Sequence, residues 1–151
     1  MSYPLDYTDL ELFDDLHEQI AIYRSLAPAT AQYFSLLDYF VHDELFYNYL
    51  SDRGVEKLMK HHLHLGDIID LSLEQNRTLC HLSERDMLAL HFMLMDLGLD
   101  FKTDTSAWQI YRKDKPPHFC LKPLKYLPDY FADQVRAHFT RYPSPSSPEP
   151  N

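Results

Sequence analysis

The stretch Val55–Leu73 (VEKLMKHHLHLGDIIDLSL) constrains the fold most, because its apolar residues recur at helical spacing around a crowded group of histidines. The apolar side of this predicted helix holds Val55, Leu58, Met59, Leu65, Ile69 and Leu73. His62 falls at the centre of that side, whereas His61 and His64 turn the other way, beside two lysines. A buried imidazole needs a hydrogen-bond partner for its ring nitrogens. The pattern therefore predicts one inward-facing histidine and two histidines at the surface.

The same helical spacing recurs along most of the chain and predicts a mainly α fold. The predicted helices span Tyr7–Leu26, Ala29–Leu50, Val55 towards Asn76 and Ser83–Gly98, and a last helix starts at Pro128. Ser83 suits the N-cap of the fourth helix, and Gly98 suits its C-terminal end. Between the fourth and last helices, Ala107–Tyr111 and His118–Leu121 have the pattern of short strands around a polar turn. We therefore expect a compact bundle of four to five helices with a small β-hairpin between the fourth and last helix.

Length and composition predict how the chain is divided. A chain of 151 residues is long enough for one domain with a real core, and we expect residues 1–142 to form it. Residues 143–151 (PSPSSPEPN) are too rich in proline and serine to form a core, so a disordered tail is predicted there. No apolar run is long enough to span a membrane, and Met1–Leu10 lacks the regions of a signal peptide. Together with Cys80 and Cys120, which are far apart and form no CxxC, these features predict a cytoplasmic protein with free thiols.

Charge is distributed unevenly along the chain. Residues 1–52 hold ten carboxylates against a single basic residue, which accounts for the whole net charge of −9. In the first predicted helix, four carboxylates share the face opposite the apolar stripe: Glu11, Asp14, Asp15 and Glu18. An acidic surface disfavours nucleic acid as a direct partner and favours a protein with a basic surface. A solvated acidic face without a partner fits the same pattern.

The predicted helix Ala29–Leu50 is apolar on two sides. Beside its main apolar face it carries a second strip, made of Tyr39, Phe46 and Leu50. A helix with two apolar sides is either central in its bundle or partly in contact with another chain. We therefore count these three residues, together with the acidic face, as partner-binding, and a homodimer is one form that such a contact can take.

Three polar residues occupy the centres of apolar faces on three different predicted helices: Glu44, His62 and His91. A buried carboxylate is costly unless it is paired, hydrogen-bonded or bound to a metal. Two imidazoles and a carboxylate on facing helices can hold iron or zinc with an open coordination position, and a pair of histidines can hold haem. Ordinary core histidines, each satisfied by a neighbour, explain the same positions, and the spacings match no specific metal motif.

Motifs for nucleophilic catalysis and nucleotide binding are absent from the sequence. There is no GxSxG, neither cysteine has a local base, and three glycines cannot form a phosphate-binding loop. The sequence therefore favours a non-enzymatic regulatory or adaptor protein that binds another protein through the acidic helical face. Two alternatives stay open: a metal- or haem-binding helical protein with its Glu/His/His site in the bundle core, and an acidic inhibitor of a nucleic-acid-binding protein.

Overall fold

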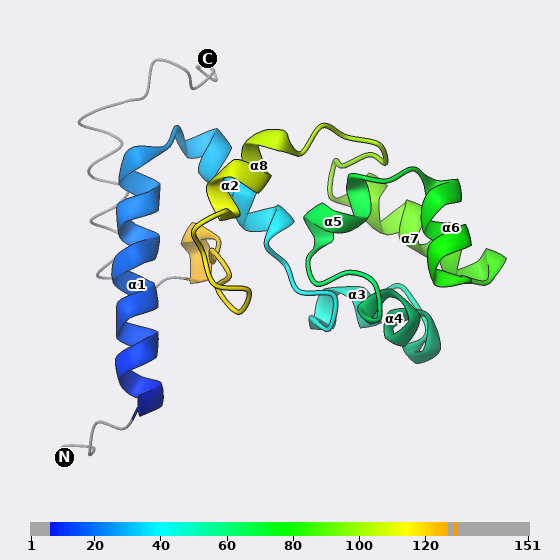
Figure 1. Ribbon diagram of the computed structural model, residues 1–151, viewed down its shortest axis with the longest axis horizontal. Coiled ribbons are helices and arrows are strands. Elements are labelled where there is room, and N and C mark those ends of the chain that lie inside the picture. Colours follow the sequence, from blue (N-terminus) through cyan, green and yellow to red (C-terminus); the bar gives the residue numbers. More distant parts are fainter. Residues whose placement is uncertain (1–6, 127–128, 130–151) are drawn as a thin grey trace. The chain divides into compact units, whose positions relative to one another are not determined.

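The computed structural model describes residues 7–126 and residue 129, with side chains described from Leu16 onward. Within these residues the chain is mainly helical and has no β-sheet, as Figure 1 shows. In chain order the elements are α1 (Tyr7–Ser25), α2 (Pro28–Leu37), α3 (Glu44–Tyr47), α4 (Asp52–Met59), α5 (Leu65–Ile69), α6 (Leu73–Cys80), α7 (Glu84–Asp96), α8 (Ser106–Arg112) and the 3-10 turn η1 (Leu124–Tyr126). The predicted fold class, mainly α, is therefore confirmed, although the helices are shorter and more numerous than the sequence predicted.

The described residues form two compact units: one holds those up to residue 35 together with those from residue 121 onward, and the other holds residues 36–120. In the first unit, α1 has the bounds that the sequence predicted to within one residue. The buried Tyr23 on α1 donates a hydrogen bond from its hydroxyl to the Lys122 carbonyl. Gln19, also buried, accepts a hydrogen bond from the Lys122 backbone N–H at 2.9 Å. Two polar side chains of α1 therefore hold the segment around Lys122 against the helix.

The predicted helix Ala29–Leu50 is wrong in extent, because α2 ends at Leu37 and the chain then becomes extended. Residues 39–41 pair in antiparallel fashion with residues 63–65. Two backbone hydrogen bonds, of 3.0 and 2.8 Å, join these segments and replace those that a continued helix would form. α3 then begins as a separate short helix, with Asp43 as its N-cap.

The predicted helix from Val55 towards Asn76 is also interrupted, and the chain forms α4, α5 and α6 in turn. Because residues 63–65 pair with residues 39–41, the chain between α4 and α5 leaves helical geometry. α6 begins at an N-cap of its own. Ser72 accepts a hydrogen bond from the Gln75 N–H at 3.0 Å, and the Gln75 side chain accepts one from the Ser72 N–H at 2.8 Å. The helical spacing of apolar residues continues through both interruptions, so the sequence pattern does not show that α4 and α5 end.

The predicted β-hairpin is wrong. Residues Ala107–Tyr111, expected as a strand, lie within α8, and residues His118–Leu121 form no strand. The physical reason is a buried carboxylate, Asp38, to which both Trp108 and Tyr111 donate hydrogen bonds. Residues three apart share one side of a helix but point to opposite sides of a strand. Only the helical conformation can therefore bring both donors to the same acceptor.

α7 begins and ends where the sequence predicted. Ser83 is its N-cap and accepts a hydrogen bond from the Asp86 N–H at 3.2 Å. Gly98, with φ of +71°, lies in the left-handed region that glycine adopts without strain. Figure 1 shows α7 beside α6, to which it is joined by a short turn at residues 81–83. Local sequence signals therefore suffice to define both ends of this helix.

Two predictions fall outside the described residues: the last helix from Pro128 and the disordered tail at residues 143–151. The single domain over residues 1–142 also stays a prediction. Among the residues that the structure describes, none of the helices is both long enough and apolar enough to cross a membrane.

The packing of α5 can be tested at Gly66. A Cβ atom at this position would lie 2.5 Å from the ring of Trp108, far inside the ordinary separation of two carbon atoms. Helix propensity alone predicts that Gly66→Ala stabilises the protein by about 1 kcal/mol. We expect the opposite sign, a loss of about 1–3 kcal/mol from overpacking. Urea unfolding measures the change, and a midpoint above that of the wild type would contradict the close contact.

Candidate functional site

His62 is buried, as the sequence predicted, and its partner is Asn76. The Nε2 atom of His62 and the Oδ1 atom of Asn76 lie 3.0 Å apart in a hydrogen bond. The Asn76 amide in turn donates to the carbonyls of Ile68 and Ser72, at 3.0 and 2.9 Å. His62 is therefore a satisfied core histidine, and it connects the turn before α5 to α6.

The structure does not bring Glu44, His62 and His91 together. Glu44 is exposed on α3, because the long helix that would have turned it inward ends at Leu37. His91 is half-buried on α7, where its ring stacks on Phe101 with ring centres 6.3 Å apart. In the described part of the chain, no group of three or more histidine, cysteine, aspartate or glutamate residues is placed to hold a metal ion. The three polar residues thus have separate surroundings, and of the three only His62 is buried.

The surface position predicted for His64 is wrong, whereas His61 is exposed as expected. His64 is only 4% exposed. Its ring lies against Phe40, with ring centres 5.0 Å apart, and makes a T-shaped contact with Trp108 at 6.0 Å. The reason is the antiparallel bridge between Phe40 and His64, which takes this histidine out of the predicted helix and turns it inward.

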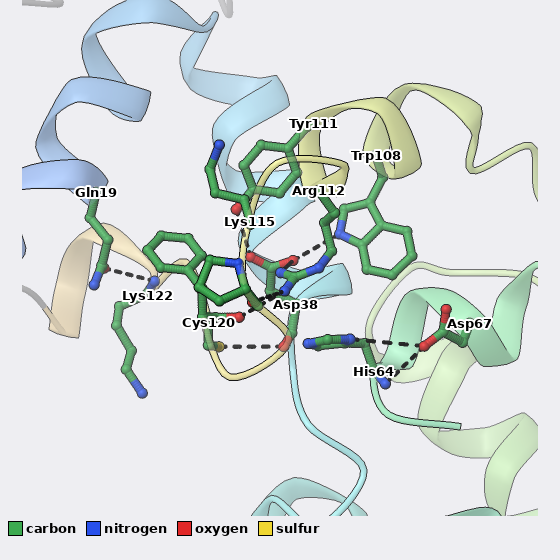
Figure 2. A network of polar contacts seen from close by, with 12 residues as sticks. Gln19, Asp38, His64, Asp67, Trp108, Tyr111, Arg112, Lys115, Cys120 and Lys122 are labelled. Atoms are coloured by element: carbon green, nitrogen blue, oxygen red, sulfur yellow. Dashed lines mark hydrogen bonds and ion pairs between the residues drawn. The ribbon is translucent and has the colours of Figure 1, made fainter. Parts of the chain in front are cut away.

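Asp38, a buried carboxylate that the sequence did not single out, lies at the centre of a network of polar contacts (Figure 2). Trp108 Nε1 and Arg112 Nη1 donate to its Oδ1 at 2.8 and 2.7 Å. The Tyr111 hydroxyl donates to its Oδ2 at 2.7 Å. Short hydrogen bonds to an ionised acceptor offset the free energy that a carboxylate loses when it leaves water. All three donors come from α8, so Asp38 anchors this helix to the chain that follows α2.

Arg112 extends the network into the loop after α8. Its Nη2 donates to the carbonyls of Pro116 and Phe119, at 3.2 and 3.0 Å. The Cys120 thiol donates to the backbone carbonyl of Asp38 at 3.4 Å. Figure 2 shows this loop passing around the carboxylate, with Cys120 and Arg112 on either side. Because these groups hold one another and the backbone, we assign the cluster a structural role.

Burial changes the protonation behaviour of groups in the second unit. Burial, reinforced by the negative charge beside it, raises the pKa of the Tyr111 hydroxyl, which therefore remains a hydrogen-bond donor. Burial lowers the pKa of His62, although its hydrogen bond opposes the shift. Burial also lowers the pKa of His64, and the Arg112 cation acts in the same direction. The folded protein therefore favours the neutral form of both imidazoles.

The apolar strip predicted to bind a partner is not exposed. Phe46 and Leu50 are buried in the core of the second unit, and Tyr39 is half-buried. The strip assumed one continuous helix, and the extended segment between α2 and α3 breaks the periodicity on which it depended. These three residues therefore form no continuous outer surface for a partner.

The acidic face of the first helix comprises Glu11, Asp14, Asp15 and Glu18. α1 is helical throughout this stretch, so helical spacing places the four residues on one face. Glu18 is half-buried, and the side chains of the other three lie outside the described residues. The acidic face as a binding surface stays a prediction.

An apolar surface that the sequence did not single out lies on α7. Three large side chains at helical spacing are about half exposed: Leu88 (56%), Phe92 (50%) and Met95 (58%). The opposite side of the same helix is buried, through residues such as Leu90 and Met93. Because the core already takes one side of α7, it does not account for the outer row. Leu88, Phe92 and Met95 together are called the α7 stripe.

A hollow of about 260 Å³ lies between α6 and α7, beside the stripe. It is lined by Leu73, Arg77, Glu84, Met87, Leu88 and His91. Three of these six residues are apolar, and the other three are a basic residue, an acidic residue and a histidine. A row of large exposed apolar residues next to a hollow is typical of a surface that contacts another protein.

Asp86 holds the beginning of α7 against the beginning of α4. It accepts hydrogen bonds from the Ser51 N–H at 3.0 Å and from the Ser51 hydroxyl at 2.8 Å. It also accepts one from the Ser83 hydroxyl at 3.2 Å. Gly54 leaves room for this carboxylate, because a Cβ atom there would lie 2.6 Å from it. The α7 stripe is therefore carried by a helix that is fixed at its N-terminal end.

The structural role of Asp38 predicts a graded loss of stability. Asp38→Ala leaves the mostly buried guanidinium of Arg112 and two further donors without their acceptor, and we expect the free energy of unfolding to fall by about 3–5 kcal/mol. Tyr111→Phe removes one donor and should cost about 1 kcal/mol. The control is Asp114→Ala, whose carboxylate is 83% exposed, so this change should leave the free energy of unfolding nearly unchanged. Equal effects of Asp38→Ala and Asp114→Ala in urea unfolding would refute the anchoring role.

The two buried histidines predict how stability depends on pH. Both have a folded-state pKa below the ordinary value of 6.5, so the unfolded chain binds more protons in the range just below 6.5. Stability should therefore be complete above pH 6.5 and should be lost as the pH falls through that range. His64→Phe should reduce this loss, because it removes one of the two titrating groups while keeping an apolar ring. His61→Ala, at an exposed position, should leave the pH profile of unfolding unchanged, and the same profile for His64→Phe would contradict the assignment.

No protein-family model, curated protein or solved structure matches the chain. The candidate site therefore rests on the geometry of the chain itself. The Asp38 cluster is enclosed and its groups bond to one another, whereas the α7 stripe is open, apolar and beside a hollow. The stripe is thus the surface on which we base a function.

Proposed function

We propose that this protein is a non-enzymatic regulatory or adaptor protein that works by binding other proteins. The observation that carries the proposal is the α7 stripe, in which Leu88, Phe92 and Met95 each expose about half of their side chain on one side of a single helix. Scattered exposed apolar residues are ordinary on a protein surface, but a continuous row on one helix marks a contact surface.

The free energy available from covering the stripe supports the proposal. Fully burying a leucine, phenylalanine or methionine side chain yields about 1.5–3 kcal/mol, so covering the exposed half yields roughly 1 kcal/mol per residue. The three residues together then contribute about 3 kcal/mol to binding. This value does not include contacts with the neighbouring hollow or with the stacked rings of His91 and Phe101. Phe92 lies in the middle of the row, where an aromatic side chain contributes most to an interface.

The acidic face of α1 is a second surface that suits a protein partner. Glu11, Asp14, Asp15 and Glu18 share a face by helical spacing, and residues 1–52 carry the whole net charge of the chain. A field of this sign accelerates association with a basic protein surface more than it tightens the complex. We propose that this face guides the approach of a basic partner, and that the α7 stripe is a separate apolar contact surface.

A photo-crosslinking amino acid at Phe92 tests the α7 stripe directly. With p-benzoylphenylalanine at this position, irradiation in cells should give a defined covalent adduct with a protein, identified by mass spectrometry. The matched control places the same amino acid at Ile110, which is 73% exposed but lies on α8. We expect several-fold more adduct from position 92 than from position 110. In a separate affinity capture, the Phe92→Glu variant should no longer retain the protein that is crosslinked at position 92. Equal yields from the two positions would refute the proposed function of the stripe.

A further inference from the structure

The shape of the α7 stripe indicates what can cover it. Leu88 and Met95 are seven residues apart, about two turns of helix, and Phe92 lies between them. A straight row of this length is the contact that one helix makes with another helix. The stripe therefore suits a second apolar helix that lies along α7.

Opposite charges lie near the two ends of the stripe. Arg85 and Asp96 are eleven residues apart, about three turns, so both side chains leave α7 on the same flank of the stripe. Both residues are exposed. Among the described residues the Arg85 guanidinium forms no ion pair, and the Asp96 carboxylate accepts a hydrogen bond from the Tyr49 hydroxyl at 2.7 Å. A carboxylate accepts several hydrogen bonds, so Asp96 can still receive a cation.

The symmetry of a homodimer decides whether parallel or antiparallel packing of the two α7 helices brings Arg85 of one copy near Asp96 of the other. A two-fold axis perpendicular to two facing antiparallel helices reverses the helix direction but keeps the same flank together. Arg85 of one copy then approaches Asp96 of the second copy, and the reciprocal pair forms at the other end. In a parallel pair the two-fold axis runs along the helices and places this flank of the two copies on opposite sides. Only the antiparallel arrangement therefore pairs the opposite charges.

We propose that the protein forms a homodimer in which α7 packs antiparallel against α7 of a second copy. Leu88 of each copy lies against Met95 of the other, and the two Phe92 rings meet near the two-fold axis. Two Arg85–Asp96 ion pairs close the ends of the apolar row on one flank. This inference rests on the proposed function, because it names the partner of the α7 stripe.

Charge and size set the strength of this dimer. The net charge of −9 opposes self-association, but all of it arises from residues 1–52 and none from the region that contains α7. One pair of helices covers less than the roughly 800 Å² per partner of a standard stable interface. The dimer is therefore a reversible one, with a dissociation constant in the micromolar range.

Charge exchange followed by analytical ultracentrifugation tests the dimer. The full-length protein should show a reversible monomer–dimer equilibrium across roughly 1–200 μM. Arg85→Glu and Asp96→Arg should each weaken the dimer by at least about tenfold, since each removes two ion pairs and sets like charges against each other. The double variant with both changes restores opposite charges and should return to within about threefold of the wild type. The matched control is Arg53→Glu on α4, an exposed change of the same charge, which should leave the equilibrium unchanged.

Each outcome decides between the proposals. A protein that remains monomeric over the whole range refutes the dimer, and so does a dimer that Arg85→Glu leaves intact. If the protein is monomeric and the Phe92 crosslink identifies another protein, the proposed function stands and the self-association fails. An adduct between position 92 and residues 127–151 of the same chain would show an intramolecular cover and overturn both. Circular dichroism of each variant confirms that any lost dimer does not reflect lost helix.

Discussion

The second unit depends above all on the buried carboxylate of Asp38. α8 has seven residues, which is too short for a helix to be stable by itself in water. Three hydrogen-bond donors of α8 converge on the Asp38 carboxylate and set the position of the helix. The Arg112 guanidinium also donates to the Phe119 carbonyl, which ties the following loop to the same carboxylate. A hydrophobic contact could not replace this set, because it lacks the direction that places a helix and a loop at once. Gly66 of α5 leaves room for the Trp108 ring, so this helix also packs closely on α5.

The parts of the fold that the sequence predicted are those with local causes. α1 and α7 have an uninterrupted apolar stripe and, in α7, a capping serine and a terminal glycine, and both helices have the predicted bounds. Two of the three breaks that the sequence missed, after α2 and between α4 and α5, have a distant cause, the pairing of residues 39–41 with residues 63–65. Residues 39–41 are of types that favour strands, but residue type does not identify the distant segment with which they pair. The error at α8 was avoidable, because Trp108, Tyr111 and Arg112 are three donors at helical spacing, which an alternating strand cannot direct to one acceptor.

The histidines show the same limit at the level of a site. A helical wheel assigns a face, and for His62 the face was correct, but it does not identify a partner. The partner of His62 is Asn76, fourteen residues further along the chain, and neither Glu44 nor His91, which the sequence placed on other helices. The sequence did not identify the α7 stripe for a related reason. It shows that the helix is apolar over a wide arc, but only the folded structure shows which apolar residues of that arc are buried and which are exposed.

α7 is attached to its unit by its inner side and by Asp86, and the outer row takes no part in either attachment. Residues that hold the fold and residues that face outward are therefore different members of the same helix. In the function that we propose, substitution of the outer row would alter what the surface binds with little loss of stability, so selection, or a protein engineer, could change the specificity of α7 independently of the scaffold. Such separation makes a small helical protein easy to diversify.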